Sequence, residues 1–212
     1  AATGIAAAFA FMRGITGSSL KMGDAFHDFI RIIVRVLVPI SFVIALILVS
    51  QGVPQTLTTE VVAQTITGQT QTLHLGSVAS LESIKHLGTN GGGFYGANGA
   101  MPFENPSSIT NLVHMLSMVM IPGGLLVSFG LMVRNRKSKY YGKEATPLIG
   151  VSSIIFLLAF ATLVLTEMKG VGMGMNWEGK EMRFGIIDSS LFTVVSTTFT
   201  TGAINNMHDS LT

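Results

Sequence analysis

Three long runs of the sequence carry no charged residue, and they constrain the fold more than any other feature. They cover residues 36–59, 105–133 and 145–166. A helix that spans a bilayer needs about 20 mainly apolar residues, and each run contains such a stretch. Only 11% of the residues are charged, against roughly 25% in a soluble domain. The sequence therefore predicts an all-α membrane protein, with residues 1–12 as the end of a fourth helix.

The basic residues predict the topology. By the positive-inside rule, links rich in Lys and Arg stay on the cytoplasmic side of a membrane. Two links, 13–31 and 134–144, hold eight of the chain's 13 basic residues: Arg13, Lys21, Arg31, Arg134, Arg136, Lys137, Lys139 and Lys143. We expect these links to be cytoplasmic and the links at 51–109 and 167–185 to face the outside. Arg35 is expected to mark the inner end of the first span, with its side chain reaching the membrane surface.

Each outer link is predicted to lead into a short helix that ends in a glycine-containing stretch. Residues 77–87 form such a helix with Ser77 as its N-cap, and GTNGGG follows. Residues 186–199, about half the length of a span, lead into TTGAIN. Gly91 and Gly202 lie 111 residues apart, a spacing that suits duplicated membrane modules rather than a solenoid repeat.

The glycine stretches favour a site for a bare monovalent cation. Irregular backbone at membrane depth is tolerated where it lines a cavity or is buried in protein. Glycine permits either sign of φ, so successive carbonyl groups can replace an ion's hydration shell, as in potassium filters. Neutral side-chain oxygens fit the same role, and neither stretch contains an acid: Thr89, Asn90, Thr198, Thr200 and Thr201. The alternative is a pair of ordinary glycine-rich turns outside the membrane.

Gly91, Gly93 and Gly96 also spell GxGxxG, the pattern of a dinucleotide site. That site needs a preceding strand and an acidic residue about 20 positions later. A short helix precedes the glycines here, prolines follow them, and the window at 111–116 reads NLVHML. We therefore reject a dinucleotide site, and the sequence contains no P-loop motif.

The remaining polar residues suggest no catalytic site. His114 lies in an apolar run and is expected to make a hydrogen bond in helix packing rather than to bind a metal. His208 and Asp209 have no third ligand nearby in the sequence, and Glu104 is expected to cap the outer loop. No nucleophile stands with a base, paired carboxylates are absent, and the chain has no cysteine.

Three segments carry a resemblance to a known family: GTNGGGFYGANGAMPFENPSSITN, NWEGKEMRFG and TTGAINNMHDSLT. Through them the chain resembles the potassium-binding, channel-like subunits of bacterial Kdp potassium pumps. Such subunits consist of four repeats, each a membrane helix, a pore helix with a filter loop, and a second membrane helix, as in potassium channels. The resemblance implies a fragment that holds the end of repeat one (1–30), repeat two (31–133), the cytoplasmic link 134–144, and repeat three through its filter (145–212).

The resemblance also implies the site. The second filter strand falls on Thr89, Asn90, Gly91, Gly92 and Gly93, and the third falls on Thr200, Thr201, Gly202, Ala203 and Ile204. The family is not uniform before the third-filter glycine, where Ser and Cys also occur, so backbone coordination at Gly202 is the firmer expectation. Potassium is the expected ion, and no other metal and no nucleotide is expected on this chain.

A subunit of this kind passes external potassium through the bacterial plasma membrane to a separate P-type ATPase subunit, and small accessory membrane subunits complete the complex. Three alternatives remain open from the residues themselves. One is a free-standing potassium channel or symporter subunit of the same superfamily, which would use the same filter without ATP. The others are a secondary transporter with broken helices and a purely structural membrane-assembly protein.

Overall fold

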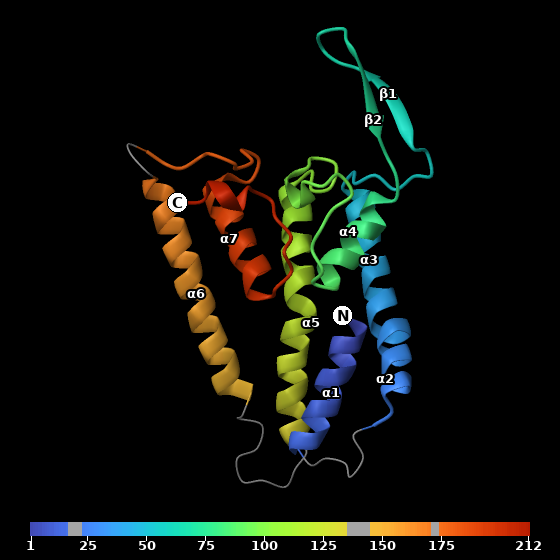
Figure 1. The fold of residues 1–212 in the computed structure, drawn as a ribbon, viewed down its shortest axis with the longest axis vertical. Helices are drawn as coiled ribbons and strands as arrows, with labels where there is room; N and C mark the ends of the chain where they lie inside the picture. The colour runs from blue at the N-terminus through green and yellow to red at the C-terminus, as the bar shows by residue number, and fades with distance from the viewer. Residues whose placement is uncertain (17–22, 135–144, 171–173) are drawn as a thin grey trace.

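A computed structural model describes residues 1–16, 23–134, 145–170 and 174–212, and these residues are mostly helical (Figure 1). The basic link predicted at 134–144 lies outside the described residues except for the backbone of Arg134, as does part of the link at 13–31. Three helical stretches are long and apolar enough to cross a membrane: Ala25–Ser50, Ser108–Val133 and Ala145–Lys169. The three predicted spans are therefore confirmed as helices of membrane-spanning length.

The first span begins earlier and ends sooner than its uncharged run suggested. Helix α2 (Ala25–Ile32) starts after Asp24, whose side chain accepts a hydrogen bond from the His27 N–H at 3.0 Å. It continues through a π-helical segment, η1 (Ile33–Leu37), into α3 (Val38–Ser50). Pro39 has no N–H to donate to the preceding turn, which agrees with a widened helix at this point. Arg35 lies within this continuous helical stretch, and its place at the inner membrane boundary stays a prediction.

The other spans are α5 (Ser108–Arg134) and α6 (Ala145–Lys169), and a shorter helix, α1 (Ala2–Thr16), precedes them all. Helix α5 continues through Pro122. In Figure 1 the first residues of α2 and α6 lie at one end of the molecule, and the first residue of α5 lies at the other. Successive spans therefore run in opposite directions, as one crossing per span requires.

Among the described residues, the sequence analysis missed one extended structure, a β-hairpin. Strands β1 (Glu60–Gln64) and β2 (Thr70–His74) pair antiparallel, with Glu60 opposite His74. The chain reverses at Gly68, where φ is +81°. The main sequence signal for a strand is an alternation of apolar and polar residues that follows its buried and solvent faces. Nearly every hairpin side chain is exposed, so the hairpin has no buried face and its sequence shows no such alternation. The hairpin projects beyond the helices (Figure 1).

Two short helices, α4 (Val78–Leu87) and α7 (Gly185–Thr198), confirm the predicted half-helices. Both contact α5, and both reach only part of the way along it from the end that carries the hairpin (Figure 1). Ser77 precedes α4 as predicted, but its side chain makes no capping hydrogen bond. Helix α4 packs against α3 through Leu48, Val78 and Leu87, and Phe192 of α7 packs against Met118 of α5. Each half-helix is therefore held by a long helix.

Candidate functional site

The two glycine loops, residues 89–93 (the first loop) and 200–204 (the second loop), follow α4 and α7 and begin with the same backbone conformation. They differ at the fourth position, where Gly92 has a φ of +88° and Ala203 has no positive φ. Thr89 and Thr200 have φ of +50° and +53°, and Gly91 and Gly202 have φ of +71° and +73°. Positive φ is a true outlier for a β-branched residue such as threonine. Such strained positions cluster at functional sites, so the repeated outlier is a structural reason to look for function here.

Hydrogen bonds end the two half-helices in the same way. The N–H of Thr89 donates to the His86 carbonyl at 3.2 Å, and that of Asn90 donates to Lys85 at 3.0 Å. The matching bonds in the second loop join Thr200 to Thr197 at 3.2 Å and Thr201 to Ser196 at 2.8 Å. This pair of bonds is a Schellman motif, whose left-handed position is usually glycine. Helix α4 ends at Leu87 with Gly88 as its C-cap, as predicted, and Thr89 occupies the left-handed position after it.

The two loops meet at Gly91. A Cβ atom added there would collide with the carbonyl oxygen of Thr201 and would lie 3.0 Å from the carbonyl carbon of Gly202. At Gly92 and Gly202, by contrast, an added Cβ would meet no heavy atom of the described residues within 4 Å. The loops therefore pack backbone against backbone at one position and leave an open side at the others.

Exposure decides which atoms of the second loop can face that open side. Thr200 and Gly202 are exposed, whereas Thr201 and Ala203 are buried, with exposed fractions of 1% and 0%. The side chains of Thr201 and Ala203 point into the protein, so these residues could offer only backbone atoms to an ion on the exposed side. This agrees with the expectation that backbone coordination is firmer than side-chain coordination here.

Buried amides connect the two half-helix units. Asn111 of α5 accepts hydrogen bonds through Oδ1 from Asn105 at 3.0 Å and from Asn205, just after the second loop, at 3.1 Å. The Arg183 guanidinium donates to the carbonyl oxygens of Asn105, at 2.6 Å, and Ala100, at 3.1 Å. The segments that follow the two loops are thus fixed relative to each other.

We expect Asn111→Ala to lower the free energy of unfolding by about 1–3 kcal/mol, because it leaves two buried N–H groups without an acceptor. Denaturant unfolding of the full-length parent protein in mixed micelles would measure the change. Ser41→Ala is the control, since the hydroxyl of the half-buried Ser41 bonds, among the described residues, only to the Val38 carbonyl of its own helix. A loss no larger for Asn111→Ala than for Ser41→Ala would contradict the bridging role.

Glu104 caps the outer loop as predicted, but from a buried position. Its side chain is fully buried, and Oε1 accepts a hydrogen bond from the Tyr95 N–H at 2.8 Å. Burial raises the pKa of Glu104, while bonds from the N–H groups of Tyr95 and Phe94 and the nearby Lys85 ammonium act in the opposite direction. Glu104 therefore caps the loop from inside the protein.

His86 and His114 form a stacked pair beside Glu82, with ring centroids 4.0 Å apart and planes 12° apart. The three side chains are buried and could be considered a metal site. The lone pairs of imidazole lie in the ring plane, however, so two nearly parallel stacked rings cannot aim at one ion without turning. The Lys85 ammonium also lies 2.8 Å from Glu82 Oε1. The arrangement therefore does not fit a metal, and His114 makes no hydrogen bond within the described residues, contrary to expectation.

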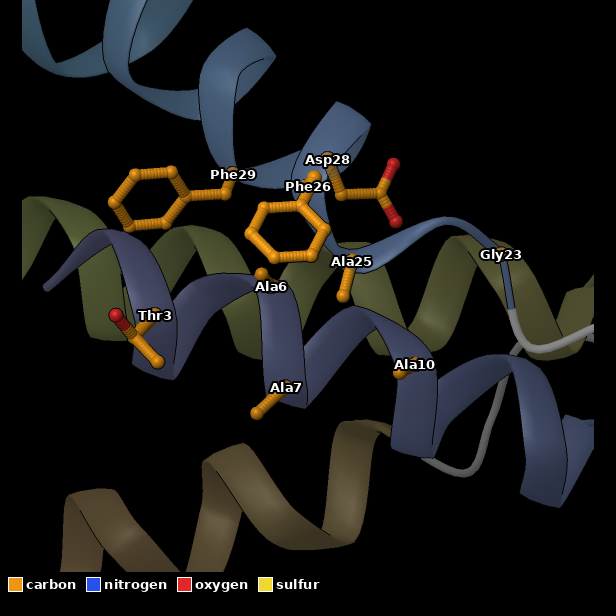
Figure 2. Close-up of a pocket in the computed structure, with 9 residues that line it drawn as sticks. All are labelled: Thr3, Ala6, Ala7, Ala10, Gly23, Ala25, Phe26, Asp28 and Phe29. Atoms are coloured by element: carbon orange, nitrogen blue, oxygen red, sulfur yellow. The ribbon is translucent and has the colours of Figure 1, made fainter.

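A separate apolar pocket lies between α1 and α2, away from both loops (Figure 2). Its wall on α1 consists of small side chains, including Ala6, Ala7 and Ala10, and the rings of Phe26 and Phe29 lie over it. Asp28, its charged residue, is paired with Arg13. This pocket offers no oxygen cluster for a cation, so the glycine loops remain the candidate site.

These features define a class: an all-α membrane protein with two half-helices that end in matching, touching glycine loops. The family model described as potassium-transporting ATPase A subunit matches residues 1–212. The chain belongs to that family.

Curated relatives agree with the family match. The chain is 46% identical over 221 residues to a potassium-transporting ATPase potassium-binding subunit of Caldanaerobacter subterraneus subsp. tengcongensis. It is 47% identical over 221 residues to the protein of the same name from Geobacillus kaustophilus. It is also 47% identical over 220 residues to the potassium-binding subunit 2 of Staphylococcus aureus. Each match covers 100% of this chain but only 38% or 39% of the relative.

Proposed function

We propose that this chain is part of a potassium-binding, channel-like subunit of an ATP-driven potassium import pump. The two glycine loops are two of the filter strands, and they bind external potassium through Thr89, Asn90, Gly91, Gly92, Gly93, Thr200, Thr201, Gly202 and Ala203. The ion then passes through the membrane to a P-type ATPase subunit, which hydrolyses ATP. This chain binds no nucleotide and catalyses no reaction itself, and small accessory membrane subunits complete the complex.

The observation that carries the proposal is a pair of loops that share left-handed backbone at their first and third positions and lie in contact at Gly91. Each loop follows the C-terminus of a half-helix, where the helix dipole places about half a negative charge. A cation at the loops is thus favoured without a carboxylate, and neutral oxygens suit a monovalent ion. The names of the relatives, potassium-binding subunits of a potassium-transporting ATPase, supply the ion and the complex.

The same proposal assigns the repeats and the topology. Residues 31–133 form repeat two and residues 145–212 form repeat three through its filter, after the end of repeat one at 1–30. The basic link 134–144 is cytoplasmic, and the loops and the hairpin face the outside of the bacterial plasma membrane. Because the chain spans about 38% of the length of its relatives, the other two filter strands come from the rest of the parent protein.

Uptake by the full-length parent complex in lipid vesicles tests the proposal. We expect potassium uptake to require both ATP and the ATPase subunit, to saturate at micromolar potassium, and to be unsupported by sodium. Vesicles that lack the ATPase subunit are the control. Rapid uptake in those vesicles, driven by the ion gradient alone, would instead identify a free-standing channel or symporter.

A further inference from the structure

Three ionisable side chains are buried behind the first loop: Glu82 and Lys85 of α4, and Glu104. Their exposed fractions are 0%, 4% and 0%. The Lys85 ammonium lies 2.8 Å from Glu82 Oε1 and 3.8 Å from Glu104 Oε2, between the two carboxylates. We call these residues the charged cluster. Ionisable side chains are expensive to bury, and those in strongly perturbed surroundings cluster at functional sites.

The charged cluster holds the first loop from both ends. The backbone carbonyl of Lys85 accepts the Asn90 N–H at 3.0 Å, near the start of the loop. Glu104, which faces the Lys85 ammonium, accepts the Tyr95 N–H at 2.8 Å, just after the loop ends. Asn90 is therefore held by the backbone of Lys85, and Tyr95 is held by Glu104, whose second oxygen lies 3.8 Å from the Lys85 ammonium.

The cluster also contacts the loop between those ends. A Cβ atom added to Gly93 would lie 2.7 Å and 2.8 Å from the two carboxylate oxygens of Glu104. Glu104 therefore packs directly against Gly93 and leaves no room for a side chain. The position of the carboxylate sets how far the Gly93 backbone can move back into the protein.

The half-helix before the second loop, α7, has neutral residues at the two positions that match Glu82 and Lys85. At the spacing that relates the two loops, Glu82 and Lys85 correspond to Thr193 and Ser196. The Thr193 hydroxyl donates to Asn206 Oδ1 at 2.9 Å, a neutral contact. A half-helix of this type can thus support its loop without ions, so the need to end a half-helix does not explain the charged cluster.

We propose that the charged cluster is a positioning element that sets the spacing of the first loop's backbone oxygens, and so the preference of the site for potassium over smaller ions. Glu104 is the positioning residue, and it acts through Gly93 and Tyr95 rather than by touching the ion. The inference rests on the proposed function of the loops. Without this support the loop can close around a smaller ion, because selectivity depends on keeping the oxygens at a fixed spacing or number.

The decisive variant is Glu104→Gln in the full-length parent complex. Glutamine has the same shape and keeps an oxygen for the Tyr95 N–H, but it loses the charge that faces Lys85. We expect the KM for potassium in potassium-stimulated ATP hydrolysis to rise about tenfold or more, equivalent to about 1.4 kcal/mol. The kcat should change less than threefold, and sodium should stimulate hydrolysis measurably. A purely structural role would lower the amount of active complex without this split between KM and kcat.

Glu167→Gln is the matched control. Glu167 is another fully buried carboxylate paired with a lysine, Lys180, and it also accepts a backbone bond, from Thr212 at 2.6 Å. None of its hydrogen-bond or ion-pair partners belongs to either loop. We expect Glu167→Gln to leave the KM for potassium and the sodium response unchanged.

Glu82→Gln changes the other carboxylate of the charged cluster, 2.8 Å from the Lys85 ammonium, and it decides the matter if Glu104→Gln does not assemble. Glu82 is not among the residues proposed to bind potassium, so a raised KM for Glu82→Gln supports the inference and an unchanged KM overturns it. Gly202→Asp separates this inference from the function itself. If Gly202→Asp abolishes potassium stimulation while Glu104→Gln leaves KM and selectivity unchanged, the loops form the filter but the cluster does not position them. If neither variant changes the response to potassium, the filter proposal fails, and this inference fails with it.

Discussion

Cells that depend on the full-length parent protein should stop growing at micromolar potassium when Gly202 is replaced by Asp, and should recover at high potassium. Gly202 is exposed and lies on the open side of the second loop. A carboxylate there turns a neutral-oxygen site into one that favours divalent ions, and its backbone must also adopt a φ of +73°. We expect apparent potassium affinity to fall on the order of 1,000-fold, equivalent to about 4 kcal/mol. Growth across a potassium series, in cells without other uptake systems, measures the change.

Membrane levels of the variant must match those of the unsubstituted protein, so that lost growth reports on the site. Unchanged growth at low potassium would return both glycine loops to the status of ordinary outer turns.

Two alanine variants provide an internal control, because Gly91 and Gly202 have the same φ within two degrees. In both variants the alanine must adopt a left-handed backbone conformation, which destabilises an L-residue by about 1–2 kcal/mol. Only Gly91→Ala also drives a Cβ atom into the Thr201 carbonyl oxygen. Gly91→Ala should therefore weaken uptake much more than Gly202→Ala, and equal effects would contradict the contact between the loops.

The hydrophobic pattern was sufficient to predict the spans and the half-helices. An uncharged apolar run of bilayer length is typical of a membrane-spanning helix, and a run of half that length is typical of a half-helix. It was less informative about their ends. Asp24 extends the first span toward the N-terminus through a local capping bond, and Gly52, at a φ of +92°, follows its last turn. Such ends depend on single residues rather than on the average character of a run.

The sequence also indicated the candidate site, but not what supports it. Glycines and threonines after two short helices suggested the loops, whereas their contact at Gly91 joins residues 111 positions apart, and no local pattern contains it. The charged cluster did leave a signal: Glu82 and Lys85 stand one helical turn apart in a chain with few charges. Glu104 could not be paired with them from spacing alone, because the intervening loop brings it back beneath Gly93.

The half-helices themselves depend on Phe192. This side chain is fully buried in α7, and it packs with Met118 of α5 and with Ala203 of the second loop. Its ring also lies edge-on to His86 of α4, with ring centroids 6.2 Å apart. Phe192 therefore connects both half-helix units, and we expect Phe192→Ala to lower the free energy of unfolding by about 3–5 kcal/mol through the cavity it leaves.

Denaturant unfolding of the full-length parent protein in mixed micelles would measure this loss. Phe42→Ala is the matched control, because the Phe42 side chain on α3 is 64% exposed and its removal should change stability by no more than about 0.5 kcal/mol. Since the cavity would open beside Ala203, Phe192→Ala should also weaken potassium affinity in whatever complex still assembles. Equal stability losses for the two phenylalanine variants would mean that the two half-helix units are held together by other contacts, such as the Asn111 bridge.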